Sequence, residues 1–448
     1  MEVLALVLFA VIFILILKGY PVAFTLGGLS VLFAIGISIF APEYFSLSIF
    51  NILPSRIMGV VNNYVLMAVP LFIFMGIMLE KSGLAQSLLE TMAMMFGSLR
   101  GGLAISVVIV GALLAASTGI VGATVVTMGL ISLPTMLKRG YKPELATGVI
   151  ASSGTLGQII PPSIVLVLLA DTINSSSRGS ESVDVGALFS AAMLPGLVLV
   201  GCYILYILIK SFINKEDAPA ISKEEIKEFR GDNFTSKIIK VLVLPILLIV
   251  IVLGSIFTGV ASPTEASAIG ALGATLLTIT QKKFTFKILK EVAQETTKLT
   301  TMVFFILLGA TTFTLVFRTL GGDDYLQELI LSSRLSPLMF LLLVMVIIFI
   351  AGFFIDFIEI VFIIVPVVTP IFNALDMNML WVGILIALNL QTSFLTPPFG
   401  FALFYLKGVA PPEIKTSQIY KGIIPFIIIQ LIIVGLVVLY PEIIFISK

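Results

Sequence analysis

The stretch GTLGQIIPPSIV, from Gly154 to Val165, contains two adjacent prolines within an otherwise apolar run. Proline has no N–H group and its ring clashes with the carbonyl one turn earlier, so this pair interrupts any helix that contains it. The same feature occurs in TSFLTPPFGFAL, from Thr392 to Leu403. The two stretches therefore predict two broken helices of the same kind.

The composition is that of a membrane protein. Of the 448 residues, 59% are hydrophobic and only 11% are charged, and the mean hydropathy is +1.17. Soluble domains carry about 25% charged residues, whereas a membrane-spanning helix needs about 20 mostly apolar residues. Such runs recur along the chain, which predicts an all-α polytopic protein of the lipid bilayer. The first run, Val3–Leu17, lacks a basic flank and a cleavage site, so we expect a retained span rather than a signal peptide.

The residue types present exclude several function classes. The net charge of +1 implies no nucleic-acid partner. The chain has no histidine, the commonest metal ligand and proton relay, and its single cysteine, Cys202, cannot form an intrachain disulfide. The sequence also lacks a nucleophile–base pair, a metal-ligand cluster and a phosphate-binding loop. We therefore expect neither enzyme activity nor an organic cofactor.

Proline spacing predicts an internal repeat. Pro134 precedes Pro161 by 27 residues, and Pro370 precedes Pro397 by the same 27 residues. Repeats with interrupted segments at matching places are typical of secondary transporters, and the interruptions indicate the binding site.

Charge in the short loops indicates that the repeats are inverted. The loop after the first hairpin-like pair carries Lys138, Arg139 and Lys142, whereas its counterpart at 373–378 has no basic residue. Because lysine and arginine mark cytoplasmic loops, the two loops are predicted on opposite sides of the membrane. The prediction is about ten crossings, two re-entrant hairpins and both termini outside. A plain bundle in which every run spans the membrane is the alternative.

These observations divide the chain into two repeats joined by a linker. The predicted parts are a first repeat at 1–210 (scaffold 1–98, transport-domain part 99–171, return helix 186–210), a cytoplasmic linker at 211–237, and a second repeat at 238–448 (scaffold 238–334, transport-domain part 335–410, final helix 420–445). The predicted apolar runs lie at about 3–17, 22–40, 63–80, 102–116, 121–137, 143–171, 186–210, 238–260, 263–281, 298–318, 336–352, 358–373, 378–407 and 422–440.

The segments beside the two breaks are candidate cation sites. A broken helix leaves backbone carbonyls unpaired, which is tolerated at membrane depth only where protein, water or an ion satisfies them. Hydroxyl, amide and carbonyl oxygens suit a hard monovalent cation such as Na⁺, although serine and threonine also simply pack in membrane helices. The candidate cation-binding residues are Ser152, Ser153, Gly154, Thr155 and Gly157 before the first break, and Asn389, Thr392 and Thr396 before the second.

The predicted hairpin tips supply further candidates. Asp356 joins the cation-binding set, because carboxylates within membranes are functional suspects, although a shallow hairpin would put it at the water interface. Glu359 is a weaker candidate. The predicted substrate-binding residues are the first tip and the two proline pairs, namely Ser117, Thr118, Gly119, Pro161, Pro162, Pro397 and Pro398. The stretch SPTEASAIG is read first as a helix start, with Ser262 and Glu265 forming a capping box.

Three stretches resemble one transporter family. These are STGIVGATVVTMGLISLPTMLKRGYKPELATGVIASSGTLGQIIPPSI (117–164), ASPTEASAIGALGA (261–274) and NLQTSFLTPPFGFALF (389–404). They resemble the large membrane subunit of tripartite ATP-independent periplasmic (TRAP) transporters. The family's first tip usually reads Ser-Gly-Ser with an acid close behind, whereas this chain has Ser117-Thr118-Gly119 and Ala123.

The resemblance implies an ion-transporter-like elevator fold in the bacterial inner membrane. It also implies sodium-coupled uptake of an organic acid, with Na⁺ as the coupling ion. The implied partners are a periplasmic substrate-binding protein and a separate small four-helix membrane subunit. A sodium- or proton-coupled carboxylate transporter or antiporter without a binding protein is the alternative, and a passive channel is a rival from another class.

Overall fold

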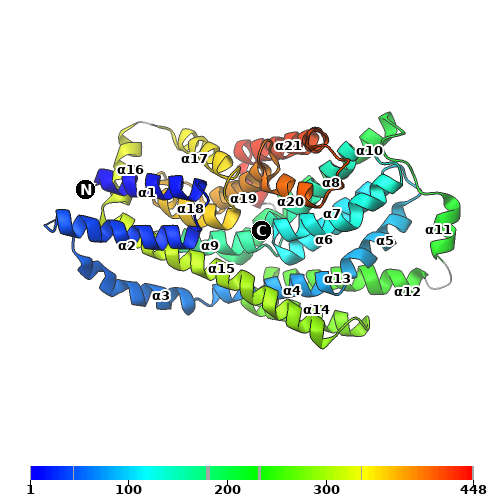
Figure 1. The fold of residues 1–448 in the computed structure, drawn as a ribbon, viewed down its shortest axis with the longest axis horizontal. Coiled ribbons are helices and arrows are strands. Elements are labelled where there is room, and N and C mark those ends of the chain that lie inside the picture. The colour runs from blue at the N-terminus through cyan, green and yellow to red at the C-terminus, as the bar shows by residue number, and fades with distance from the viewer. Residues whose placement is uncertain (1, 44, 178–181, 231–233, 334, 446–448) are drawn as a thin grey trace.

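A computed structural model describes residues 2–43, 45–177, 182–230, 234–333 and 335–445. Its regular structure within these ranges is helical, without strands. Figure 1 shows the helices as an elongated bundle. The first half contains α1 Glu2–Leu17, α2 Val22–Phe40, α3 Leu53–Val61, α4 Ala68–Lys81, α5 Leu84–Phe96, α6 Gly102–Thr118, α7 Val121–Lys138, α8 Pro143–Thr155, α9 Ile164–Ser176 and α10 Val185–Ile213.

The second half follows the short helix α11, Lys223–Arg230. It contains α12 Phe234–Ile238, α13 Leu244–Phe257, α14 Pro263–Thr280, α15 Phe286–Thr319, α16 Gly322–Ser332, α17 Pro337–Ala351, α18 Phe357–Ala374, α19 Met379–Leu395, α20 Phe401–Val409 and α21 Thr416–Leu439. Single turns of tighter or wider helix, η1 to η5, lie at Leu47–Ile52, Val65–Met67, Leu156–Gln158, Ile239–Val243 and Pro441–Phe445.

The predicted apolar runs correspond to helices, and both predicted breaks are present. The run at 143–171 divides into α8 and α9, and the run at 378–407 divides into α19 and α20. The predicted start of α15 at 298 was wrong, because the helix begins at Phe286 and its first turns carry charged residues. The predicted apolar runs also left out the short helices α3, α5 and α16.

Seven of the described helices are long and apolar enough to cross a membrane, or eight if the bent pair Leu47–Val61 and Val65–Lys81 forms one span. The sequence predicted about ten crossings. Two of the seven, α7 and α18, are arms of the predicted re-entrant hairpins, whereas α1, α6, α9, α17 and α19 are shorter apolar helices. Helix length therefore establishes a multi-pass protein, and the number of crossings stays a prediction.

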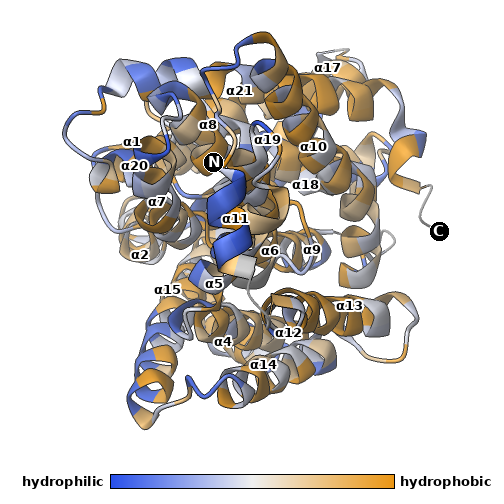
Figure 2. Ribbon diagram, turned by 90° about the vertical axis from the view of Figure 1, so that its right-hand side faces the viewer, coloured by the Kyte–Doolittle hydropathy of each residue, from blue (hydrophilic) through white to orange (hydrophobic). Residues whose placement is uncertain are grey.

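The helices separate into two groups that meet along α6 and α9. In Figure 2, α4, α12, α13 and α14 lie at the bottom of the view, while α8, α17, α18, α19 and α21 lie above them. In the lower group α4 packs against α14, and α2, which Figure 2 shows higher in the view, packs against α15. In the upper group α9 packs against α18, and α7 packs against α20. Each of these four pairs joins one helix of the first half to one of the second.

Two helices form the centre of the upper group. In α8 every residue from Leu145 to Thr155 is buried, and in α19 every residue from Val382 to Leu395 is buried. A helix that is buried on all sides belongs to a core. These are the two helices that end at the proline breaks, so the helix end before each break is packed inside protein.

A close backbone contact fixes α8 against α21. A Cβ added at Gly422 would lie 2.0 Å from the carbonyl oxygen of Glu144, and one added at Gly148 would lie 2.2 Å from the carbonyl oxygen of Gly422. Only glycine at these positions allows the two backbones to approach this closely.

The described part of the linker is tied to the loops around α5, α6 and α7. The N–H of Ile221 donates to Gly97 O at 2.8 Å, and the N–H of Gly101 donates to Ala218 O at 3.0 Å. Arg139 forms a two-pronged ion pair with Glu225, with nitrogen–oxygen distances of 3.1 and 2.5 Å. The described part of the linker is therefore folded onto the loops around α5, α6 and α7, and we call this folded segment the clamp.

Asp217 is the buried centre of this clamp, with a side chain only 3% exposed. Its carboxylate lies 2.5 Å from Lys142 Nζ and 3.4 Å from Lys210 Nζ. Burial by itself would raise the pKa of Asp217, but the hydrogen bonds from Lys142 and Asn214 and the two lysine charges outweigh it, so the pKa is lowered.

Substitution Gly422→Ala is expected to destabilise the protein, because the new methyl group forces α21 away from α8. Overpacking of this kind costs roughly 1–3 kcal/mol, which a lower thermal unfolding midpoint in detergent would reveal. Gly435→Ala on the same helix is the matched control, since an added Cβ there meets nothing within 4 Å. Equal midpoints for the two variants would contradict the close contact.

Asp217→Asn is expected to weaken the ion pairs that hold the linker against the loops. Tryptic cleavage of the linker should then be about threefold faster, because a solvent-screened ion pair stabilises by up to about 1 kcal/mol. Glu216→Gln, at an exposed neighbour, is the control. Because the folded pKa is lowered, the ion pairs hold above the ordinary value of 3.8 and are lost as the pH falls through the folded value. The difference between wild type and variant should therefore persist from about pH 7 to pH 5, and a difference that vanished in this range would refute the assignment.

Candidate functional site

The first break follows a cluster of buried hydroxyl groups. Ser152, Ser153 and Thr155 are all fully buried in the last turn of α8. Their hydroxyls donate to carbonyls three residues earlier, at 3.1, 3.1 and 3.0 Å. Each hydroxyl oxygen therefore keeps its acceptor lone pairs, which are the groups that a cation requires.

The first hairpin lies directly against this break. A Cβ added at Gly154 would lie 2.4 Å from Val125 of α7, and one added at Gly157 would lie 2.2 Å from the carbonyl oxygen of Ala115 on α6. The predicted cation residues Gly154 and Gly157 thus have a packing role, since they allow both hairpin arms to touch the end of α8. A cation role for them stays a prediction.

The proline pairs have different surroundings. Both Pro161–Pro162 and Pro397–Pro398 are joined by a cis peptide bond. Pro161 and Pro162 are buried, whereas Pro397 is half-buried and Pro398 is exposed. In this conformation the first pair is therefore not accessible to a substrate, and only the second reaches a surface.

The second break repeats the hydroxyl pattern with an added amide. Thr392 and Thr396 donate to carbonyls four residues earlier, each at 2.8 Å. Asn389 donates from Nδ2 to Met345 O of α17 at 2.7 Å, which leaves its amide oxygen as a possible ligand. The second hairpin is seated here as well, because a Cβ added at Gly352 would lie 2.1 Å from Ser393 Oγ.

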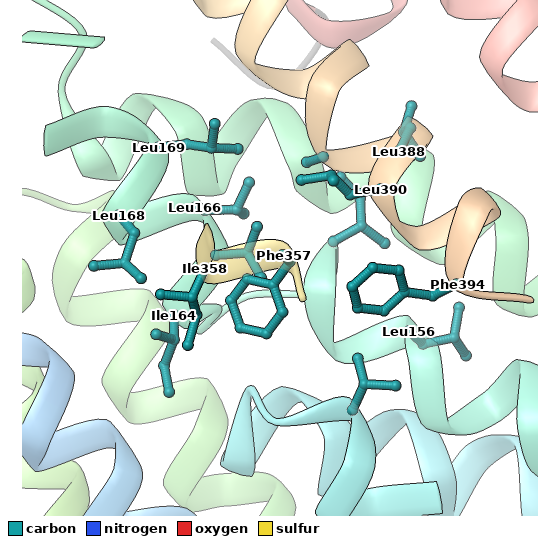
Figure 3. Packing of buried hydrophobic residues seen from close by; sticks show 14 of the residues in the cluster. Leu156, Ile164, Leu166, Leu168, Leu169, Phe357, Ile358, Leu388, Leu390 and Phe394 are labelled. Carbon is teal, nitrogen blue, oxygen red and sulfur yellow. The ribbon is translucent and has the colours of Figure 1, made fainter. Parts of the chain in front are cut away.

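The two breaks and the two hairpins meet at one apolar cluster. Leu156 of η3, Ile164 of α9, Phe357 of α18 and Phe394 of α19 converge there (Figure 3). The rings of Phe357 and Phe394 have centroids 6.4 Å apart. The structure therefore brings together the segments that the sequence singled out from both halves of the chain.

The acidic candidates begin helix α18. Asp356 Oδ1 accepts the N–H of Phe357 at 2.7 Å, and Glu359 accepts the N–H of Asp356 at 3.3 Å. Together they form a capping box, so helix capping is the role of these acids that the structure supports directly. The predicted capping box of Ser262 and Glu265 is confirmed at the start of α14.

Asp356 also lines a cavity of about 320 Å³. The walls come from the first hairpin at Ile120–Ala123, from the second break at Phe394 and Phe401, and from Tyr405 of α20. Among the described lining residues Asp356 is the only carboxylate, and none is basic. This cavity is the candidate substrate chamber.

The first tip is only partly described. Gly119 adopts a left-handed conformation (φ 61°) that ends α6, and its N–H donates to Ala115 O at 2.8 Å. Its glycine identity is thus explained by the turn. The side chains of Ser117 and Thr118 lie outside the described residues, so their predicted substrate role remains a prediction.

Gln158 is a further candidate at the first break that was not among the residues predicted from the sequence. Its side chain is fully buried, and neither amide atom has a hydrogen-bond partner among the described residues. The residue stands between Gly157 and the prolines, within an otherwise apolar stretch. A lone amide at a helix break was the signal that could have identified it.

Comparison with a solved structure first defines the class. The fold is similar to that of the YdaH transporter of Alcanivorax borkumensis, with a TM-score of 0.63, 88% of each chain covered and 15% identity. Together with the apolar spans and the two broken helices, this similarity assigns the chain to the polytopic helical membrane proteins with a transporter fold.

The family follows from the sequence comparison. The model described as tripartite ATP-independent periplasmic transporter, DctM component, matches residues 9–443, and the chain belongs to this family. It is 30% identical to the C4-dicarboxylate TRAP transporter large permease protein DctM of Vibrio cholerae, over 97% of this chain and 95% of that protein. It is 28% identical to the sialic acid TRAP transporter large permease protein SiaM of the same organism, over 88% of each chain.

Family membership confirms the resemblance found in the sequence. The relatives are transport permeases of tripartite systems, which fits a transporter role for this chain in a multi-pass membrane protein. The family also indicates association with a small membrane subunit and a periplasmic binding protein.

Gly352→Ala is expected to displace the second hairpin from α19 and to lower the thermal unfolding midpoint, because the new methyl group collides with Ser393. The second substitution, Ser393→Gly, removes both close side-chain atoms, Oγ and Cβ, which lie 2.1 and 2.8 Å from the Cβ that Gly352→Ala adds. The double variant should therefore recover part of the loss made by Gly352→Ala. If the loss in the double variant equals the sum of the losses in the two single variants, the contact between Gly352 and Ser393 is refuted.

Proposed function

We propose that this protein is the large permease of a sodium-coupled, binding-protein-dependent uptake system for an organic acid, working by an elevator mechanism. The observation that carries the proposal is the candidate chamber beside Asp356, whose described lining contains an acid and no base. An organic anion entering this chamber meets repulsion unless a cation neutralises the acid. A requirement for Na⁺ in the same site would supply that neutralisation and couple the two fluxes.

The proposed cation ligands are the oxygens at the ends of α8 and α19. The first set is Ser152, Ser153 and Thr155 with the backbone at Gly154 and Gly157, to which we add the unpartnered amide of Gln158. The second set is Asn389, Thr392 and Thr396, and Asp356 of the chamber completes the proposed cation-binding residues. Neutral oxygens at broken helices are a recurring arrangement for sodium in secondary transporters.

Matching contacts support the internal repeat that the proposed inverted architecture requires. The proline landmarks of the two halves are 236 residues apart, which aligns Ser153 with Asn389. Ser153 lies against Gly111 of α6, and Asn389 donates to Met345 of α17. Equivalent residues thus contact the first arm of the hairpin in each half. The pairing of α4 with α14 and of α2 with α15 agrees with the same symmetry.

The two helix groups support the proposed division of the chain into a fixed scaffold and a moving transport domain. The scaffold would consist of 1–98 and 238–334, and the sliding transport domain of 99–171 and 335–410, with 186–210 and 420–445 as the final helix of each half. The hydrogen bonds and ion pairs of the linker would lie on the cytoplasmic side, and both termini on the periplasmic side. The transported acid would be held at the hairpin tip and proline breaks.

Uptake into proteoliposomes tests the proposal directly. The purified complex with its small subunit should accumulate a radiolabelled organic acid only with the periplasmic binding protein outside and an inward Na⁺ gradient. Gln158→Leu and Thr392→Val should raise the Na⁺ concentration for half-maximal uptake several-fold, because each removes one oxygen ligand. Thr135→Val, at an exposed threonine of α7, is the control.

Other outcomes favour the alternatives. If uptake is unchanged without sodium and follows the proton gradient, the coupling ion is H⁺ rather than Na⁺. Asp356 would then be the first residue to test as the proton carrier. Uptake that needs no binding protein would favour an independent carboxylate transporter or antiporter. Flux that never exceeds equilibrium would indicate a channel.

A further inference from the structure

A second cavity, of about 350 Å³, lies between α3 and α15 on one side and α9 and α18 on the other. It is lined by Arg56 and Arg318, and by the polar residues Asn63 and Asp171. It shares no lining residue with the chamber beside Asp356. Its volume is within the range of small-molecule sites.

The two arginines make one wall of this cavity positive. Arg318 is fixed, because its Nε lies 2.8 Å from Asp323 Oδ2 and its Nη2 donates to Ser176 O at 3.2 Å. Arg56 is half-buried and close enough to Arg318 for the two charges to repel each other. Among the described residues no acid forms an ion pair with Arg56. A bound anion would remove this repulsion.

The opposite wall carries a negative group. Asp171 Oδ1 accepts from Asn63 Nδ2 at 2.5 Å. Within the described ranges no ion pair joins Asp171 to either arginine, although all three line the same cavity. The separated charges are therefore arranged for a ligand that carries both an anionic group and a hydrogen-bond donor.

We propose that this cavity binds a small carboxylate that also carries a donor, as a hydroxy acid or an amino acid does. The carboxylate is held by the guanidinium group of Arg56, whose forked donors match carboxylate geometry. Arg318, which already binds Asp323 and Ser176 through Nε and Nη2, contributes its remaining Nη1 donor. The hydroxyl or ammonium group donates to Asp171. Binding of this kind rests only on the cavity and its charges.

The place of this site in transport rests on the proposed function. Helices α3 and α15 belong to the proposed scaffold, and α9 and α18 belong to the proposed transport domain. A ligand here contacts both, and the Asn63–Asp171 hydrogen bond already crosses the same boundary. The site is thus an initial binding site, which the organic acid occupies before it reaches the chamber beside Asp356.

Protection from thiol labelling measures binding without any transport. Gly59 lines the cavity, is exposed, and has nothing within 4 Å of an added Cβ. Gly59→Cys in a Cys202→Ser background is reacted with an uncharged maleimide in the presence of L-malate, succinate or sulfate at equal ionic strength. Malate and succinate differ by one hydroxyl group, so they report on Asp171 separately from the arginines.

The expected result is that malate protects about tenfold better than succinate, the effect of one hydrogen bond to a charged group, and that sulfate protects least. Asp171→Asn should abolish the preference for malate. Arg56→Gln should weaken protection by both acids about tenfold, Arg56→Lys less, and Arg100→Gln, at an exposed arginine outside the cavity, not at all. An unchanged labelling rate without ligand shows that each variant is folded.

Equal protection by sulfate and the two acids, or full protection in Arg56→Gln, would overturn the assignment. Labelling requires neither sodium nor the binding protein, so this result is independent of the uptake experiment. If the acids protect the thiol of the Gly59→Cys variant but uptake fails, the anion site is supported and the proposed transport function is refuted. If uptake succeeds but the acids do not protect this thiol, the transport function is supported and the anion site is refuted.

Discussion

Every polar backbone group inside an apolar protein needs a partner, and the two broken helices expose such groups in the core. At the first break the chain supplies its own partners, since Ser163 donates to Gln158 O at 2.8 Å. At the second break a distant helix contributes, because the hydroxyl of Tyr420 on α21 donates to Pro398 O at 2.6 Å. The proposed sodium sites depend on the hydroxyl, amide and carbonyl oxygens beside the breaks that can still accept a ligand.

Small residues make this arrangement possible. Ser153 of α8 and Ser393 of α19 are small hydroxyl residues, and the facing hairpin arms carry Gly111 and Gly352 where the contacts are closest. The backbones can therefore approach until the hairpins touch the breaks. The same close packing leaves little freedom within the upper helix group, so a large movement would displace the group as a unit against the helices below it.

The sequence was sufficient to predict the helices and the breaks, because apolar runs and Pro-Pro pairs are local signals. It was not sufficient for α15, whose charged first turns hide a continuous helix, or for the capping role of Asp356, which depends on the local backbone geometry. Burial was also beyond its reach, since nothing in the two proline pairs indicates that Pro161 is buried while Pro398 is exposed. The cavity between Arg56 and Asp171 depends on residues more than 100 positions apart, which no sequence spacing connects.

The contact between Gly148 and Gly422 also bears on how the protein is made. Helix α8 packs against α21, which lies much later in the chain, so this contact cannot form until α21 has been synthesised and inserted. Until then the side of α8 that carries Gly148 lacks this neighbour. Loss of α21 would therefore damage the packing of a helix that was translated long before it.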